Sequence, residues 1–212
     1  MKLIPYSVHT GAENMQIDLN LLEELILSKT LEPVFRLYGW SPKCISLGRN
    51  QKGDKFNKDI DCVRRLTGGR ALLHDDEVTY SCVFPVSIIP NGDKVTESYK
   101  YISGILINFF KTLGVELDFG ENKKISTHFE YCMLLSTGAD VCYKGQKIIG
   151  SAQYRKEGYV LQHGSILFGY DKKLLESIFH EEVRGITTVK EILPNINREE
   201  FVQAFEHFLS QL

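Results

Sequence analysis

Residues 64–81, RRLTGGRALLHDDEVTYS, place two arginines, a Thr-Gly-Gly turn and a histidine within one short segment. A Gly-Gly pair lets the backbone adopt positive φ and approach a ligand with no Cβ in the way. Arginines beside exposed amide N–H groups form a site for a carboxylate, phosphate or acyl oxygen. The segment therefore predicts an anion-binding turn. The alternative is an ordinary hairpin with surface arginines.

A second segment, residues 145–166 with the sequence GQKIIGSAQYRKEGYVLQHGSI, also carries residues suited to a ligand site. Lys147 precedes a strand-like run, and the GSA turn at 150–152 would let a second stretch of backbone close over a ligand. His163 and Gly164 would then come from the next strand. Each feature is weak alone, but their order after the first segment favours one shared site.

The two segments together resemble the biotin/lipoate protein ligase family. The first matches its RR-x-[ST]-GG-x-A-x-x-H signature, and the second matches its G-x-K-[IV]-x-GSA and HG segments. The resemblance extends from about Gly11 to about Tyr170 and implies an acyl-binding site. The substrate-contacting residues that it implies are Arg64, Arg65, Thr67, Gly68, Gly69, Arg70, His74, Gly150, Ser151, Ala152, His163 and Gly164.

Members of this family handle activated acyl groups by several routes, and Cys132 favours one of them. In octanoyltransferases that use a central cysteine, the resemblance places that cysteine fifteen residues before the motif lysine, as Cys132 precedes Lys147. Arg70 in the TGGR turn also resembles this branch. The resemblance thus implies that octanoate leaves a carrier-protein thioester for Cys132 and then passes to a protein lysine, without ATP or metal.

The implied chemistry is consistent with the residue types. A thiolate is the attacking form of cysteine, and a nearby ammonium favours it, so Lys147 could activate the thiol and orient the acyl carbonyl. Amides of Gly68 and Gly69 could stabilise the oxyanion. Alternatives stay open: Cys132 could be a small buried hydrophobe, and Cys142 is the main rival nucleophile. His74 and His163 could be core histidines.

An ATP-dependent lipoate ligase is the principal alternative. Ligases of this family usually carry Asn-Asp before the motif lysine, where this chain has Ala139-Asp140. ATP and Mg²⁺ would be cofactors only on that reading. We also expect no C-terminal accessory domain, because the chain ends at Leu212. An amidotransferase between lipoyl proteins, and a ligase-like domain that only binds a carrier protein, are the remaining alternatives.

Bulk composition restricts the class of protein. The 212 residues are 43% hydrophobic and 25% charged, which suits one globular domain. Apolar runs are too short to span a membrane, and the N-terminus lacks a secretory signal. Five cysteines without CxxC spacing argue against disulfides and zinc. We therefore expect a cytoplasmic protein, monomeric and bound to neither nucleic acid nor membrane.

Charge is unevenly distributed along the chain, although the net charge is only −2. Residues 43–70 hold eight Lys or Arg against three Asp. This excess favours an acidic partner near the predicted site, and a solvated loop is the alternative. The resemblance implies octanoyl-acyl carrier protein as donor, and lipoyl domains or the glycine-cleavage H protein as acceptors.

Hydrophobic periodicity and turn residues predict the elements that position these residues. Helices are expected at 14–29, 99–113 and 171–179 and after a cap at Asn197, and strands at 33–40, 44–48, 62–65, 71–74, 78–84 and within 138–169. This order is not a βαβ series. We expect an α/β (α+β) fold in one domain, 1–212, with a bent mixed or antiparallel sheet flanked by helices, as the resemblance also implies.

Overall fold

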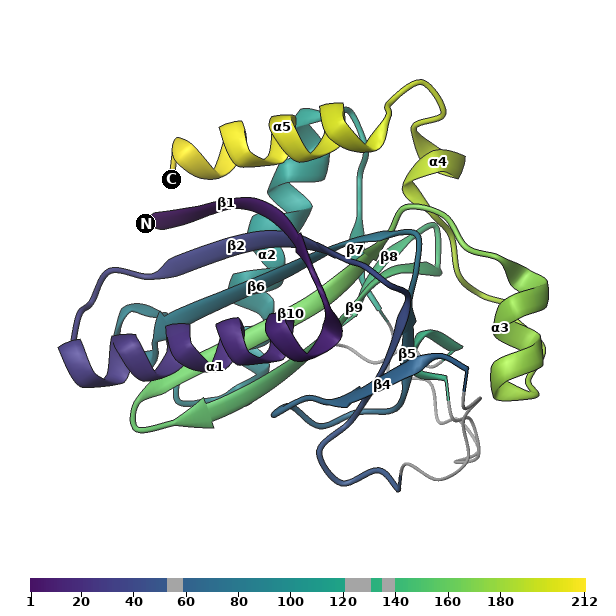
Figure 1. The fold of residues 1–212 in the computed structure, drawn as a ribbon. Coiled ribbons are helices and arrows are strands. Elements are labelled where there is room, and N and C mark those ends of the chain that lie inside the picture. The colour runs from purple at the N-terminus through teal and green to yellow at the C-terminus, as the bar shows by residue number, and fades with distance from the viewer. Residues whose placement is uncertain (53–58, 121–130, 135–139) are drawn as a thin grey trace.

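The structure is a computed structural model that describes residues 1–52, 59–120, 131–134 and 140–212. Its main feature is a seven-stranded mixed sheet (Figure 1). Along the sheet the strands are β1 (Lys2–His9), β2 (Val34–Trp40), β6 (Glu77–Pro85), β10 (Tyr159–Leu167), β9 (Gln146–Lys156), β8 (Val141–Tyr143) and β7 (Asp118–Phe119). The expected fold class is therefore confirmed.

The first two strands depart from the predicted order of elements. β1 and β2 are parallel and are joined by helix α1 (Gly11–Ser28), which makes one βαβ unit before the antiparallel part of the sheet. The sequence analysis assigned no strand before the helix. β1 is an edge strand, only half-buried, and carries Pro5 in its interior, so its hydrophobic pattern is weak.

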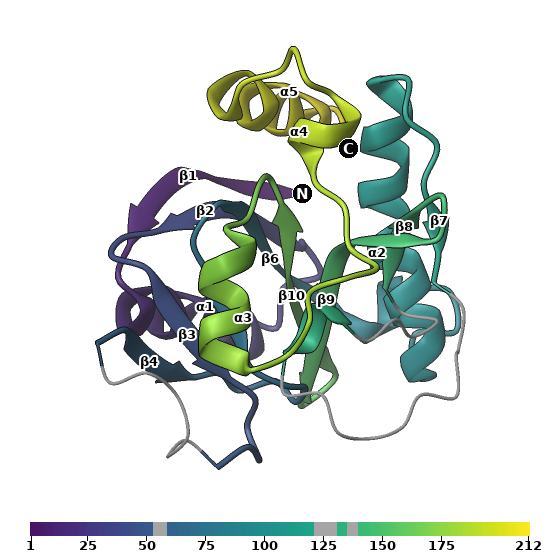
Figure 2. The same ribbon diagram turned by 90° about the vertical axis from the view of Figure 1, so that its right-hand side faces the viewer.

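A smaller three-stranded sheet carries the arginine-rich segment. Its order is β4 (Asp61–Arg64), β3 (Cys44–Leu47) and β5 (Leu72–His74), with β3 in the centre. The turn at residues 65–71 connects β4 to β5. Helix α3 (Lys172–Phe179) packs against this sheet in a separate hydrophobic cluster, and Figure 2 shows the helix beside β3.

Alternation along the strands of the main sheet separates a structural face from a functional face. Phe35 and Leu37 of β2 pack with α2 (Val95–Thr112) and α5 (Arg198–Ser210) in the largest core cluster. Val34 precedes Phe35 in the strand, so its side chain points to the opposite face, where it packs with α1. Figure 1 shows α1 and α5 on opposite sides of the sheet. On the face of the sheet that α1 covers, the residues that lie past the N-terminal end of the helix are therefore available for a site.

Aromatic packing between α2 and α5 stabilises the structural face. Phe205 is fully buried, and its ring stacks on Phe109 with centroids 4.1 Å apart. Phe205→Ala should lower the free energy of unfolding by about 3–5 kcal/mol, through lost burial and a residual cavity. Urea unfolding measures this, and Phe119→Ala at a 37% exposed position is the control. Equal small losses for both variants would contradict this account of the core.

The buried stripe of α1 differs from the predicted one. We expected Met15, Leu19, Leu22 and Ile26 to face the core, but the buried residues include Asn14, Asp18, Leu21, Leu22 and Leu25. Two buried polar residues shift the apparent stripe, because Asn14 and Asp18 bind Arg36 inside the protein. The helix also begins three residues earlier than expected. Thr10 and Glu13 form a capping box there.

Other boundaries follow the predictions with small shifts. α2 begins at Val95 rather than Tyr99, whereas α3 has Asp171 as its N-cap and α5 has Asn197 as predicted. Of the predicted apolar stripe of α5, Phe201 and Phe205 are buried but Leu212 is 59% exposed. Three short helices were not predicted: η1 (Val86–Ile88), η2 (Cys132–Leu134) and α4 (Val189–Ile192).

Candidate active site

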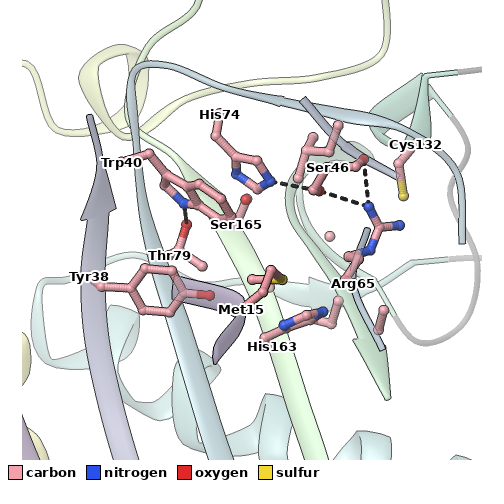
Figure 3. A pocket seen from close by; sticks show the side chains of 15 residues that line it. Met15, Tyr38, Trp40, Ser46, Arg65, His74, Thr79, Cys132, His163 and Ser165 are labelled. Carbon is pink, nitrogen blue, oxygen red and sulfur yellow. Dashed lines mark hydrogen bonds between the residues drawn. The ribbon is translucent and has the colours of Figure 1, made fainter. Parts of the chain in front are cut away.

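A cavity lies between the α1 face of the main sheet and the small sheet, and we call it the inner cavity (Figure 3). Its lining atoms leave about 400 Å³ of space between them, including the part that is open to solvent. Its surface is mostly apolar. The lining residues are Met15, Tyr38, Trp40, Ser46, Arg65, Leu72, His74, Thr79, Cys132, Gly150, Ser151, Ala152, His163, Gly164 and Ser165.

A second, more open and more polar cavity adjoins the first, and we call it the outer cavity. Cys132, Ser151 and Ala152 line both cavities. Lys147 and Asp140 line only the outer one. The remaining lining residues are Gly68, Gly69, Arg70, Tyr99 and Gln153. Cys132 therefore lies at the junction of a buried apolar space and an open polar space.

Cys132 is the cysteine best placed for chemistry among the five. It begins the short helix η2, its side chain is partly exposed, and its backbone N–H donates to the Ala71 carbonyl at 2.9 Å. Burial raises the pKa of the Cys44 thiol to about 12, and it raises the pKa of Cys82 well above its ordinary value. Cys142 is buried in β8 and lines neither cavity. The geometry thus favours Cys132 over its rival.

Lys147 lies next to the backbone of Cys132. Its side chain is 2% exposed, and Nζ lies 3.0 Å from Asp140 Oδ1. Nζ also donates to the carbonyl oxygen of Cys132 at 3.2 Å. The ammonium is thus paired with a buried carboxylate and fixes the main chain at the thiol. Asp140 is described, whereas Ala139, the other residue of the ligase comparison, lies outside the described residues.

The glycine turn is held in shape by the two arginines that precede it. Arg65 donates to the carbonyls of Ser46, Gly68 and Arg70 at 2.7–3.0 Å. Arg64 donates to three carbonyls of residues 48–51 and lines neither cavity. Arg65 therefore lies in the site with the turn, but the structure gives Arg64 a supporting position instead of a place on the cavity wall.

Three glycines of the site are required at their positions, one by its backbone conformation and two by close contacts. Gly69 has φ of 95°, which L-residues rarely adopt. A Cβ at Gly164 would lie 2.6 Å from the carbonyl oxygen of Gly150, too close for van der Waals contact. At Gly150 a Cβ would meet the sulfur of Met133 at 2.7 Å and the side chain of Lys147 at 3.0 Å. The GSA and HG segments thus pack together around the lysine.

His74 belongs to a buried hydrogen-bonded chain at the wall of the inner cavity. Its Nδ1 lies 2.5 Å from Glu77 Oε1, and its Nε2 lies 2.7 Å from Ser46 Oγ. Trp40 stacks on the imidazole with centroids 3.7 Å apart and donates its indole N–H to Thr79. The pKa of His74 is lowered, chiefly by burial. His74 is therefore both a satisfied buried histidine and a lining residue.

His163 joins helix α1 to the glycine turn. Its Nδ1 lies 3.2 Å from Asp18 Oδ2, and its Nε2 lies 2.7 Å from Thr67 Oγ1. Tyr38 donates its hydroxyl to the same Asp18 oxygen at 3.1 Å, and Arg36 pairs with the other. This network is buried. It brings Thr67 and His163, predicted from segments far apart in the sequence, into direct contact.

Sequence reasoning missed several residues that line or support the site. Asp18 and Glu77 supply its buried carboxylates, and Tyr99 reaches the outer cavity from α2. Burial raises the pKa of Tyr99 to about 12, so its hydroxyl stays protonated. The other lining residues that were missed are Met15, Tyr38, Trp40, Ser46, Leu72, Thr79, Gln153 and Ser165. Glu77 follows His74 by three residues in HDDE, which was a signal, but Asp18 looked like one exposed residue of an amphipathic helix.

The described residues contain neither a candidate metal-binding group nor a candidate membrane-spanning helix. No group of three or more His, Cys, Asp or Glu in the described part of the chain could hold a metal ion. No described helix has the length and apolar character needed to cross a membrane.

The class of domain that this fold forms is identified by comparison with known families. A family model described as the lipoyl protein ligase A/B catalytic domain matches residues 10–210. The chain therefore belongs to the lipoyl protein ligase A/B catalytic-domain family. This confirms the resemblance found in the sequence.

Relatives named octanoyltransferase LipM are similar to most of the chain. The protein from Macrococcus caseolyticus is 39% identical over 183 residues, which cover 78% of this chain and 65% of the relative. The protein from Carboxydothermus hydrogenoformans is 39% identical over 177 residues, covering 80% and 65%. This chain thus matches about 65% of the length of these relatives.

Solved structures show the same fold at low sequence identity. A lipoate-protein ligase A bound with ATP aligns with a TM-score of 0.75 and 20% identity, covering 99% of this chain and 84% of that one. A bi-partite lipoate protein ligase from Thermoplasma acidophilum aligns with a TM-score of 0.71 and 17% identity, covering 100% and 84%. At such identities the likeness establishes the fold alone.

Proposed function

We propose that this protein is an octanoyltransferase of lipoate biosynthesis that works through a thioester on Cys132. The observation that carries the proposal is the position of Cys132 at the junction of the two cavities. The apolar inner cavity suits an acyl chain. The open outer cavity suits the arm that delivers the acyl group, and then the lysine that receives it.

In the proposed first step, the Cys132 thiolate attacks the thioester carbonyl of octanoyl-acyl carrier protein. A new C–S bond forms at Cys132, the carrier's C–S bond breaks, and the carrier thiol leaves with a proton. Gly68 and Gly69 line the outer cavity, and their backbone amides are the proposed donors to the oxyanion. Lys147, bound to the Cys132 carbonyl, orients this backbone against the acyl group.

In the proposed second step, a lysine of a lipoyl domain or of the glycine-cleavage H protein attacks the same carbonyl. That amine must first lose a proton, because its ordinary pKa is about 10.4. A C–N bond forms, the C–S bond to Cys132 breaks, Cys132 leaves as a thiolate, and the second proton released by the amine passes to solvent. Thioester exchange is nearly thermoneutral and the amide is more stable, so the sequence of steps needs neither ATP nor Mg²⁺.

Relatives named octanoyltransferase support this route over the alternatives. A lipoate ligase is the second candidate, because Asp140 is paired with Lys147 and the sequence resemblance implies that ligases handle nucleotide near that aspartate. An amidotransferase would use the same cysteine with a lipoyl protein as donor. Cytoplasmic location and monomeric state stay predictions from the sequence.

Intact-mass analysis tests the proposal directly. The protein is mixed with octanoyl-acyl carrier protein in the absence of ATP and Mg²⁺. We expect a gain of one octanoyl group that hydroxylamine removes, followed by octanoylation of added lipoyl domain. Transfer that requires free octanoate and ATP would establish a ligase instead. An adduct formed only from an octanoylated lipoyl protein would establish an amidotransferase.

The basic section at residues 43–70 is proposed as the docking surface for the acidic carrier protein. Arg49 and Lys52 are exposed, and the Arg49 backbone N–H donates to the carbonyl of Thr67 in the glycine turn. The section therefore lies beside the site in the fold. Lys55, which the sequence also pointed to, lies outside the described residues.

Reversing Arg49 and Lys52 to Glu should raise the KM for octanoyl-acyl carrier protein, mainly through slower association, and should make that KM less dependent on salt than in the unmodified protein. The rate with a small octanoyl thioester should stay nearly unchanged, because that substrate needs no docking surface. Steady-state kinetics with both substrates measure the difference. Lys111→Glu with Lys173→Glu makes the same charge change at exposed positions elsewhere. An equal rise in KM for the control pair would show that the effect comes from net charge and not from a docking surface.

A further inference from the structure

The guanidinium of Arg65 is buried beside the site and is surrounded by neutral oxygens. The residue is 7% exposed. Nη1 donates to the carbonyl and the hydroxyl of Ser46, both at 2.8 Å, and Nη2 donates to the carbonyls of Gly68 and Arg70. Within the described residues it forms no ion pair with a carboxylate. A buried cation without a counter-ion is costly, so an anion at this place would be stabilised.

Arg65 is also held by a chain of buried side chains that ends on a carboxylate. His74 donates from Nδ1 to Glu77, which leaves Nε2 to accept from the Ser46 hydroxyl. The Ser46 oxygen in turn accepts from Arg65 Nη1. The neutral imidazole that this pattern needs is favoured by burial, which lowers the pKa of His74. The chain fixes the position of the guanidinium.

Cys132 is the group that the guanidinium faces. In Figure 3 the Cys132 sulfur points toward the Arg65 guanidinium across the mouth of the inner cavity. Backbone hydrogen bonds also bring the two residues close together. Arg65 donates to the carbonyl of Arg70, and the carbonyl of the next residue, Ala71, accepts the Cys132 N–H. Burial lowers the pKa of Arg65, and a negative charge on Cys132 acts to raise it. Such an interaction is reciprocal.

We propose that Arg65 supplies the positive charge that stabilises the Cys132 thiolate, and that Ser46, His74 and Glu77 are its positioning residues. Lys147 was expected from the sequence to fill this role. Its ammonium is instead paired with Asp140 and bound to the Cys132 carbonyl, so its charge is already neutralised. The inference rests on the proposed function, in which Cys132 is the nucleophile.

The assignment places Arg65 in both steps of the proposed reaction. When the thiol ionises, its proton passes to solvent and Arg65 keeps its own protons. The same guanidinium then faces the sulfur when the thiolate leaves in the second step. No proton transfer through the His74 chain is required, because that chain holds Arg65 and does not titrate during transfer.

Alkylation of the full-length protein by iodoacetamide, without any acyl substrate, tests the assignment. Rates at pH 7 and pH 10 are followed for the Cys132 peptide by mass spectrometry, with exposed Cys62 as reference in the same protein. The variants are Arg65→Met, Arg65→Lys, Ser46→Ala and Lys147→Met, the last made together with Asp140→Asn so that no buried carboxylate is left unpaired. The titratable or charged groups of the described residues that line a cavity with Cys132, or interact with it electrostatically, are Tyr38, Arg65, Arg70, His74, Tyr99, Tyr131, Asp140, Lys147 and His163.

We expect Arg65→Met to slow Cys132 alkylation at pH 7 by roughly tenfold or more. A nearby cation commonly lowers the pKa of a thiol by about one unit or more. Arg65→Lys should retain most of the rate, Ser46→Ala should lose about threefold, and Lys147→Met should stay within about twofold. At pH 10 the rates should converge because most of the thiol is ionised there. Cys62 should react equally in all variants.

Two results would overturn the assignment. One is normal alkylation in Arg65→Met. The other is a large loss at pH 7 in Lys147→Met with little change in the Arg65 variants. If Arg65→Met does not fold, judged by circular dichroism, an unchanged rate in Ser46→Ala overturns it instead. The proposed function is judged separately by the octanoyl adduct: its absence together with the expected alkylation pattern would reject that function and leave the Arg65–Cys132 pairing standing.

Discussion

Replacing Cys132 with serine is expected to abolish both the octanoyl adduct and transfer to lipoyl domains. Removing the nucleophile of a covalent enzyme typically costs about four orders of magnitude or more in rate. The change is small and the site is partly exposed, so the fold should be kept. Intact mass after mixing with octanoyl-acyl carrier protein, and the rate of lipoyl-domain octanoylation, are the measurements.

Cys142→Ser is the matched control for this experiment. Cys142 is buried in β8 and lines neither cavity, so its replacement should lower stability modestly and keep most of the activity. Loss of the adduct in Cys142→Ser with retention in Cys132→Ser would reverse the assignment of the nucleophile.

Lys147→Ala should lose about 10²–10³ in rate, the usual effect of removing one electrostatic donor from an active site. The structural reason is the contact of Nζ with the Cys132 carbonyl, which places the thiol against the acyl group. The measurement is kcat/KM with octanoyl-acyl carrier protein. A near-normal rate would reduce Lys147 to a structural residue.

Stability has to be separated from activity in that variant, because Lys147→Ala leaves Asp140 buried without its cation. Breaking a buried ion pair typically costs about 3–5 kcal/mol. The double variant Lys147→Ala with Asp140→Asn removes both charges and should recover part of the lost Tm. Its activity should stay as low as that of the single variant. Recovery of activity together with Tm would show that the lysine acts only on the fold.

The sequence predicted the fold class, and it predicted which segments lie close together in space, because both are encoded in local patterns. The glycine turn, the GSA segment and Cys132 are contiguous motifs, and the structure brings them to the same two cavities. Helix α5 was equally predictable, since its cap and its stripe of phenylalanines are local signals.

The rest depended on tertiary contacts that no short pattern records. Asp18 is part of the site only because Arg36, on the strand after α1, and His163, in β10, meet it inside the protein. The direction of the Lys147 ammonium, toward a carboxylate and a carbonyl, depends on how the neighbouring strand and η2 pack. β1 was missed because an edge strand with a proline has little hydrophobic signal.

The backbone N–H and the backbone carbonyl of Lys147 both form hydrogen bonds with the segment that connects α3 to α4. Its N–H donates to the carbonyl of Gly185, and its carbonyl accepts from Thr187, each at 2.9 Å. Chains are synthesised from the N-terminus at about 5–20 residues per second. The strand that carries this lysine therefore stays without its second bonding partner until residues 185–187 have been made. The strand that carries Lys147 is therefore completed late, by a segment that lines neither of the two site cavities.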